Sequence, residues 1–254
     1  GVMGDFSAPY RVTRQEAPPS ATRKVCRVCG SANMTPFLDL GRVPLANAYL
    51  REDEISRPEF KEALVLQLCR GCGLTQLTKV VPPERMFRHY LYRSSTPKTF
   101  HDHCRDLAKT AAAKASCKEG DLVLDIASKD ACLLSKFREN GLRDVGVDPA
   151  ENIVPDAEKA GIPTLCAYWS RGVALDILSR FGPPKIITSQ NVLGHTDDVH
   201  EFAAAVDRCL APRGLWIIEV PYILDFIRHN EFDTAYHEHL SYFSIAALAA
   251  LGDK

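Results

Sequence analysis

The sequence predicts an α/β protein in which a small, β-rich, cysteine-containing domain precedes a parallel, doubly wound sheet. Two C-x-x-C-G segments lie at residues 26–30 and 69–73, and short apolar runs alternate with helical segments from Gly120 onward. A tyrosine, two histidines and three acids gather within residues 231–239. Short strands that alternate with helices of about ten residues are typical of parallel βαβ units.

The apolar runs and the helical periodicity set the order of the expected elements. Strands are expected at 122–127, 145–147, 163–167, 185–189 and 215–220. Helices are expected at 84–92, 98–115, 132–140, 153–160, 171–181, 199–210 and 244–251. Composition and the Pro-Pro break near residue 82 then divide the chain into a flexible segment at 1–22, the cysteine-containing domain at 23–82, a helical connector at 83–115 and the parallel-sheet domain at 116–254.

Composition excludes several classes of function. The chain has 254 residues, a formal net charge of −1 and a pI of about 6.8, so it lacks the basic character of proteins that bind nucleic acid or anionic membranes. No apolar run approaches the roughly 20 residues of a membrane span, and no apolar signal core begins the sequence. Nine cysteines, an odd number, favour a reducing compartment over a disulfide framework. We therefore expect a cytoplasmic protein.

Cys26, Cys29, Cys69 and Cys72 form two nearly identical knuckles, each followed by a glycine. Two residues between thiolates allow both sulfurs to reach one tetrahedral Zn²⁺ at about 2.3 Å, and the glycine allows the chain to turn beneath the metal. Four protein ligands leave no open position, so we expect structural zinc and a zinc-binding domain at 23–82. A redox dithiol or two disulfides are the alternatives. The five isolated cysteines are expected to be small buried hydrophobes.

Two acids mark the ends of the first two strands of the parallel sheet. Asp125 precedes the small residues Ala127 and Ser128, and Asp148 closes the next strand. No G-x-G-x-x-G follows the first strand, which disfavours a nicotinamide cofactor. Asp148 suits a ribose diol, and Asp125 suits a ligand that carries an amino acid moiety, so the pair fits S-adenosylmethionine. The alternative is that each aspartate caps the helix that follows it.

The cluster at 231–239 follows the last strand of the expected sheet, where open α/β sheets bind their ligands. Tyr236, Glu238 and His239 lie within four residues of one another. A histidine titrates near neutrality and can be oriented by such neighbours, so the cluster predicts a general base. The alternative is a polar loop whose histidines cap helices or bind carbonyl groups of the core.

These segments together resemble the sugar C-methyltransferases of deoxysugar and antibiotic biosynthesis, over about residues 26–244. The knuckles are similar to the N-terminal zinc domain of that family. Similar segments are Tyr-Leu-Tyr-Arg-Ser-Ser at 90–95, Gly-Val-Asp-Pro-Ala at 146–150, Asn-Val-Leu-Gly-His at 191–195, Glu-Val-Pro-Tyr at 219–222 and the stretch at 231–244. The resemblance implies a Rossmann-like class I methyltransferase sheet, with Asn191 and Tyr90 among the residues that hold S-adenosylmethionine.

The resemblance also implies a substrate and a mechanism. The substrate would be a nucleotide-linked 4-keto-deoxysugar, from which a base removes the proton beside the ketone before the enolate carbon attacks the sulfonium methyl group. By similarity His239 is the expected base, and Tyr236, Glu238 and His195 orient it or stabilise the enolate. Tyr90 and Tyr92 are expected to help close the pocket.

Two departures from the family support an alternative function. The family carries Ala-Ser-Asn-Asp-Gly after the first strand, whereas this chain carries Lys129 and Ala131 at the third and fifth positions. No sequence remains here for the last two strands of a seven-stranded sheet or for the family's C-terminal domain. We therefore expect a sheet without its C-terminal strands, which self-association or a partner chain would complete. The alternative function is a non-catalytic or incomplete zinc-plus-Rossmann scaffold subunit.

Overall fold

The computed structural model describes residues 19–253, except for residues 51, 83–85 and 87–97. Tyr90 and Tyr92, and nearly all of the helix expected around them, lie outside the described residues. Among the residues that are described, no helix has the length and the apolar character needed to cross a membrane.

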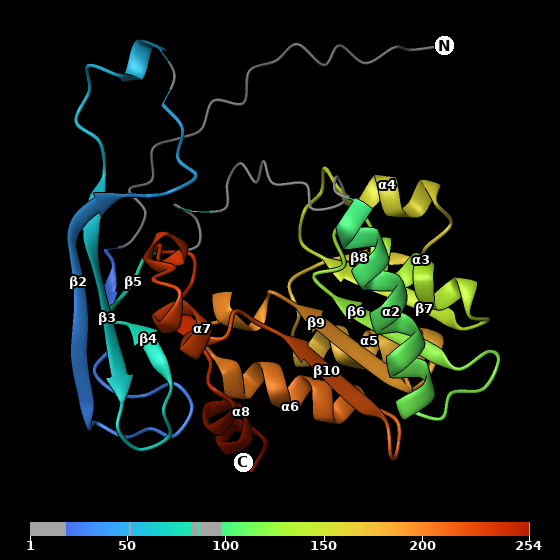
Figure 1. The fold of residues 1–254 in the computed structure, drawn as a ribbon. Coiled ribbons are helices and arrows are strands. Elements are labelled where there is room, and N and C mark those ends of the chain that lie inside the picture. Colours follow the sequence, from blue (N-terminus) through green and yellow to red (C-terminus); the bar gives the residue numbers. More distant parts are fainter. Residues whose placement is uncertain (1–18, 51, 83–85, 87–97, 254) are drawn as a thin grey trace.

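A parallel five-stranded sheet and the helices that cover it form the larger part of the described molecule (Figure 1). Its strands follow the order β10-β9-β6-β7-β8, and every neighbouring pair is parallel. Their bounds are β6 (Leu122–Ile126), β7 (Arg143–Asp148), β8 (Thr164–Cys166), β9 (Ile186–Gln190) and β10 (Leu215–Glu219). All five strands were expected from the apolar runs, and only their ends differ by a few residues.

Helices cover both faces of this sheet, which confirms the doubly wound α/β prediction. Leu122, Leu124 and Ile126 of β6 share a core with α5 (Arg171–Phe181) and α6 (Val199–Cys209). Val123 points to the opposite face, because side chains alternate along a strand. The helices α2 (Lys98–Lys114), α3 (Cys132–Glu139) and α4 (Val154–Lys159) contribute residues to the core on that face.

The strand order places a topological switch point between β6 and β9. The chain runs from β6 through β7 to β8 on one side, and then returns to form β9 and β10 on the other. Loops that leave adjacent strands in opposite directions open a crevice at the carboxyl edge of a sheet. The loops after β6 and β9 therefore border the place where a ligand is expected.

An antiparallel sheet forms the N-terminal module. Its long strands β2 (Met34–Pro44) and β3 (Lys61–Cys69) are followed by β4 (Thr75–Leu77), and a separate pair joins β1 (Ala21–Thr22) to β5 (Lys79–Val80). Two irregularities interrupt the β2–β3 register, after Pro36 and after Asp39. The short helix η1 (Glu52–Glu54) lies in the connection between β2 and β3.

The fourth strand of the N-terminal sheet comes from the C-terminal end of the described chain. β11 (Ser241–Tyr242) pairs with β4, giving the order β11-β4-β3-β2. The expected division at 116–254 contains these two residues, and the sequence pattern does not predict a strand there. Around β11 lie α7 (Ile223–Arg228), η3 (Phe232–Thr234) and α8 (Ile245–Gly252), and Figure 1 shows α7 and α8 between the two sheets.

The two sheets share one hydrophobic core. Val28 and Leu74 of the N-terminal module pack in the same cluster as Leu193, Phe243 and Ala247. Polar contacts reinforce this packing, since the Nε2 atom of His200 on α6 lies 2.7 Å from the carbonyl oxygen of Val28.

Arg27 is a deeply buried polar link between the module and the rest of the chain. Its side chain is fully buried, its Nε donates to Asp197 at 3.0 Å, and its Nη1 donates to the carbonyl of Leu240 at 2.9 Å. Arg70 has the same position in the second knuckle, but it is exposed, and the side-chain contact seen for it in the described residues is a hydrogen bond from its Nε to Thr35 at 3.2 Å. Arg70 therefore serves as an exposed control for Arg27 at the equivalent position of the other knuckle.

We expect Arg27→Gln to lower the free energy of unfolding by about 2–4 kcal/mol, because it removes a buried cation and leaves the Leu240 carbonyl short of a donor. Arg70→Gln should change it by no more than about 0.5 kcal/mol. Denaturant unfolding of the two variants beside the unaltered chain measures both values. Equal effects would contradict the linking role of Arg27.

Candidate functional site

A cavity opens at the switch point of the parallel sheet. The residues that line it are Phe100, Asp125, Ala127, Ser128, Lys129, Asp130, Cys132, Leu133, Gln190 and Asn191. Four of the residues expected to bind a cofactor, namely Asp125, Ala127, Ser128 and Asn191, therefore share one cavity. Asp148 borders it through a hydrogen bond to the backbone of Lys129.

The two aspartates at the strand ends are held by neighbouring groups and do not cap helices. Asp125 is buried and accepts a hydrogen bond from Thr188 Oγ1 at 2.6 Å. Burial raises the pKa of Asp125 to about 7. Asp148 accepts from the backbone N–H groups of Lys129 at 2.8 Å and Ala150 at 2.9 Å. Because α3 and α4 begin at residues without a side-chain cap, the capping alternative does not describe either aspartate.

The loop after β6 is strained at three alternate positions. Ala127, Lys129 and Ala131 have φ angles of 60°, 51° and 59°, in the left-handed region that favours glycine. Ala131 stands where the family described above carries glycine, and it adopts a positive φ angle here. The loop also packs closely against β7, because a Cβ atom at Gly146 would lie 2.5 Å from the Ser128 hydroxyl oxygen. Strain of this kind persists where the surrounding structure fixes the loop, often at functional sites.

Tyr236 and His239 form a hydrogen-bonded pair. The Tyr236 hydroxyl lies 2.8 Å from Nε2 of His239, and Nδ1 of His239 lies 2.9 Å from the carbonyl oxygen of Thr234. A carbonyl only accepts, so Nδ1 carries the proton and Nε2 of the neutral ring offers a lone pair. Burial lowers the pKa of His239, which keeps the ring neutral at pH 7.

His195 lies beside this pair, in the short helix η2 (Leu193–His195) that follows β9. Its ring centroid is 4.9 Å from that of His239, and its Nδ1 donates to the carbonyl of Glu238 at 2.9 Å. Burial, followed by the charge of His239, lowers the pKa of His195 to about 4. The same argument leaves Nε2 of His195 as an acceptor, so two neutral imidazoles lie side by side, with an angle of 63° between their ring planes.

The side chains of Glu238 and His237 face the N-terminal module. The Glu238 carboxylate accepts from Asn47 at 2.7 Å, and burial raises its pKa. His237 places Nε2 3.2 Å from the carbonyl oxygen of Glu62. Glu238 thus orients His195 through its backbone carbonyl, whereas its carboxylate contacts a residue that the sequence pattern does not single out.

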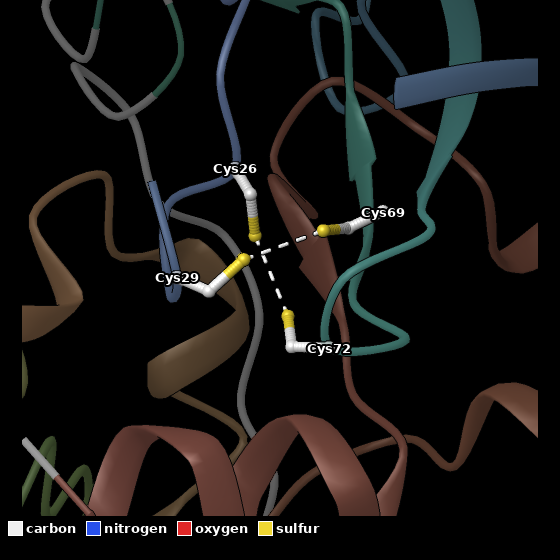
Figure 2. A group of neighbouring side chains, drawn as sticks. All are labelled: Cys26, Cys29, Cys69 and Cys72. Atoms are coloured by element: carbon white, nitrogen blue, oxygen red, sulfur yellow. Dashed lines mark hydrogen bonds between the residues drawn. The ribbon is translucent and has the colours of Figure 1, made fainter. Parts of the chain in front are cut away.

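The four knuckle cysteines converge on one point (Figure 2). The Sγ atoms of Cys26 and Cys72 are 3.6 Å apart, those of Cys29 and Cys69 are 3.5 Å apart, and all four lie within 4.8 Å of one another. A tetrahedron with Zn–S bonds of about 2.3 Å separates its sulfurs by about 3.8 Å, whereas a disulfide needs about 2.05 Å. The donor set therefore fits a tetrahedral metal ion, and all four thiols are free of disulfides.

Two family descriptions match the chain. The "Putative zinc binding domain" family matches residues 26–87, and the "Methyltransferase domain" family matches residues 95–254. The second match covers more than half of the chain and contains the cavity, His195 and the Tyr236–His239 pair.

The C-methyltransferase NovU from Streptomyces niveus is 35% identical over 226 residues, which make up 89% of this chain and 54% of NovU. DesVI from Streptomyces venezuelae is a structural match at 18% identity and a TM-score of 0.39, covering 49% of this chain and 52% of DesVI. The plantazolicin methyltransferase BpumL, solved with SAH, matches at 13% identity and a TM-score of 0.48, covering 61% and 63%. The chain thus spans about half the length of NovU.

Acid should destabilise the protein through its buried neutral histidines. The pKa of His195 falls from 6.5 in the unfolded chain to about 4 in the folded one, so between these values only the unfolded chain binds the proton. We expect a loss on the order of 2 kcal/mol from this residue between pH 7 and pH 5. His195→Asn removes the titration and keeps a donor for the Glu238 carbonyl. Its unfolding free energy should depend less on pH, and an unchanged slope would contradict the assignment.

Proposed function

Because the chain belongs to the methyltransferase-domain family, we propose that it takes part in S-adenosylmethionine-dependent C-methylation of a nucleotide-linked 4-keto-deoxysugar. The observation that carries this proposal is the Tyr236–His239 pair, whose Nε2 lone pair suits the removal of a proton from carbon. The name of the relative NovU supports methyl transfer to carbon. We also propose a zinc-binding domain at 23–82, a connector at 83–115 and a methyltransferase domain at 116–254.

The cavity at the switch point supplies the proposed cofactor site. Asp125, Ala127, Ser128 and Asn191 line it, and Asp148 lies at the end of the neighbouring strand, where a carboxylate suits a ribose diol. S-adenosylmethionine supplies an electrophilic methyl group on a positively charged sulfur. Buried or partly buried carboxylates at Asp125 and Asp130 favour such a cation.

His239 is the proposed base. It accepts the proton from the carbon beside the substrate ketone at Nε2, while Nδ1 stays bonded to the Thr234 carbonyl. The Tyr236 hydroxyl already lies 2.8 Å from that nitrogen, so it is close enough to donate to an enolate oxygen formed there. Bound S-adenosylmethionine would supply the methyl group to the enolate carbon, and the electron pair of the broken carbon–sulfur bond would remain on sulfur.

Zinc is the proposed resident metal, held by Cys26, Cys29, Cys69 and Cys72. The sulfur separations support this proposal, and four protein ligands leave no position for a substrate. Burial raises the pKa of Cys26 and Cys72, so a cation is needed to hold these thiols in the thiolate form. The metal would hold the knuckles against the shared core and take no part in the chemistry.

A non-catalytic scaffold is the second candidate function. Lys129 and the three residues of positive φ after β6 favour it, since they add a positive charge and strain where a cationic cofactor is proposed. Calorimetric titration with S-adenosylmethionine separates the two functions, because a scaffold that has lost the cofactor site gives no binding heat.

We expect about one zinc ion per purified chain. Cys69→Ser should release most of it and lower the thermal midpoint by about 10 °C or more, because metal binding adds directly to folding free energy. Cys166→Ser should retain both the zinc and the midpoint, because Cys166 is isolated from the knuckles and exposed, where the sequence predicted a buried side chain. Metal analysis with thermal unfolding provides the measurement, and full zinc content in Cys69→Ser would exclude this ligand set.

We expect His239→Asn to slow methyl transfer about 10²–10⁴-fold, because asparagine can donate to Thr234 but offers no basic nitrogen. A thymidine-diphosphate-linked 4-keto-6-deoxyhexose is a suitable probe. Loss of its α-proton to deuterated water, measured by mass spectrometry, should slow by a similar factor while cofactor affinity stays within about threefold. His229→Asn is an exposed control. Unchanged turnover in His239→Asn would show that His239 is not the base.

A further inference from the structure

Glu219 is an acid at the carboxyl edge of the sheet, and no step of the proposed mechanism uses it. It ends β10 directly opposite Gln190, the last residue of β9. Its Oε2 accepts from Gln190 Nε2 at 3.2 Å, and its Oε1 accepts from Asn191 Nδ2 at 3.4 Å. Its backbone carbonyl also accepts from the Asn191 N–H at 2.7 Å. Glu219 therefore holds two consecutive residues that line the cavity.

These contacts determine whether the NH₂ group or the carbonyl oxygen of the Gln190 and Asn191 side chains is available to a ligand. A carboxylate only accepts hydrogen bonds, so the NH₂ groups of Gln190 and Asn191 turn toward Glu219. The carbonyl oxygen of each amide is then directed away from Glu219. Oxygen atoms at the border of the cavity suit a positively charged ligand, whereas NH₂ groups there would oppose one.

Asn191 needs such restraint, because its φ angle is 52°. Asparagine tolerates the left-handed region better than most residues, yet the conformation persists only where neighbours fix it. Two hydrogen bonds provide that restraint, one from the backbone N–H of Asn191 and one from its side-chain NH₂ group, and Glu219 accepts both.

Glu219 is itself fixed by a residue of α2. Nε2 of His103 lies 2.6 Å from Glu219 Oε2, and Phe100, one turn earlier on the same helix, lines the cavity. This contact ties the covering helix to the carboxyl edge. One third of the Glu219 side chain remains exposed beside this contact, so the carboxylate charge of Glu219 still acts on the neighbouring groups.

The charges around the cavity agree with this arrangement. Asp125 and Asp130 line it, and Lys129 is the one basic residue among its described lining residues. The negative charge of Glu219 adds to the effect of burial, which is the larger cause of the raised pKa of Asp125. A cation in the cavity would relieve the repulsion between these carboxylates.

We propose that Glu219 is a positioning residue that directs the amide oxygens of Gln190 and Asn191 toward the cofactor and so makes the site prefer the sulfonium cofactor to its neutral thioether product. The proposal rests on the proposed function, since it concerns the same cavity. It assigns Glu219 no contact with reacting atoms.

The test compares two ligands that differ in charge at sulfur. S-adenosylmethionine carries the positive charge, and S-adenosylhomocysteine does not. In Glu219→Gln the side chain can donate as well as accept, so the neighbouring amides lose their fixed orientation and the site loses a negative charge. We expect calorimetry to show the affinity for S-adenosylmethionine at least about tenfold lower, and that for S-adenosylhomocysteine lower by no more than about threefold.

Two further variants complete the experiment. Glu219→Asp keeps the charge and should restore at least part of the preference, and Glu231→Gln removes an exposed acid elsewhere and should leave both affinities unchanged. An equal loss of both affinities in Glu219→Gln, or no loss, would overturn the proposal and leave the proposed function standing. An unaltered chain that binds neither ligand would overturn the proposed function and this inference with it.

Discussion

The pairing of β11 with β4 is the constraint on which the rest of the site depends. Only two residue pairs form it, yet the carbonyl of Leu240, just before β11, accepts from both the Leu77 N–H and the Arg27 guanidinium. His239 is the next residue toward the N-terminus. The backbone that carries the proposed base is therefore attached to the N-terminal module that also contains the cysteine knuckles, so the proposed metal site and the Tyr236–His239 pair share one support.

Backbone carbonyl groups set the chemistry of the two histidines. The Thr234 carbonyl takes the Nδ1 proton of His239, and the Glu238 carbonyl takes that of His195, so each ring presents its unprotonated nitrogen. Burial then keeps both rings neutral, because a charged imidazole would lose its hydration. A loop of fixed backbone can thus prepare a base without a carboxylate partner, and this leaves the Glu238 carboxylate to bond with Asn47.

Local sequence patterns predicted the parts of this structure that depend on interactions between residues close together in the sequence. Apolar runs located the five parallel strands, and the C-x-x-C spacing identified the four sulfurs that converge. β11 was not predicted, because a two-residue strand has no periodicity and its partner lies about 165 residues away in sequence. For the same reason sequence indicated Glu238 but not the direction of its carboxylate, which Asn47, 191 residues away, determines. Glu219 and Gln190 were missed as site residues because they acquire a role only when β9 and β10 align.

The loop after β6 joins the two halves of the site electrostatically. The backbone N–H of Lys129 is fixed by Asp148, which holds the strained turn in place. The positive charge of Lys129 lowers the pKa of Asp125 and so opposes the effect of burial, which raises it. At His195 the same positive charge acts in the direction of burial and of the charge of His239, and all three lower the pKa. The charge of this one side chain therefore favours ionised Asp125 in the proposed cofactor site and a neutral imidazole at His195, beside the proposed base. Both protonation states are those that the proposed cationic cofactor and the proposed carbon base would require, so the charge of Lys129, which departs from the family pattern, is compatible with the proposed catalysis as long as the surrounding carboxylates balance it.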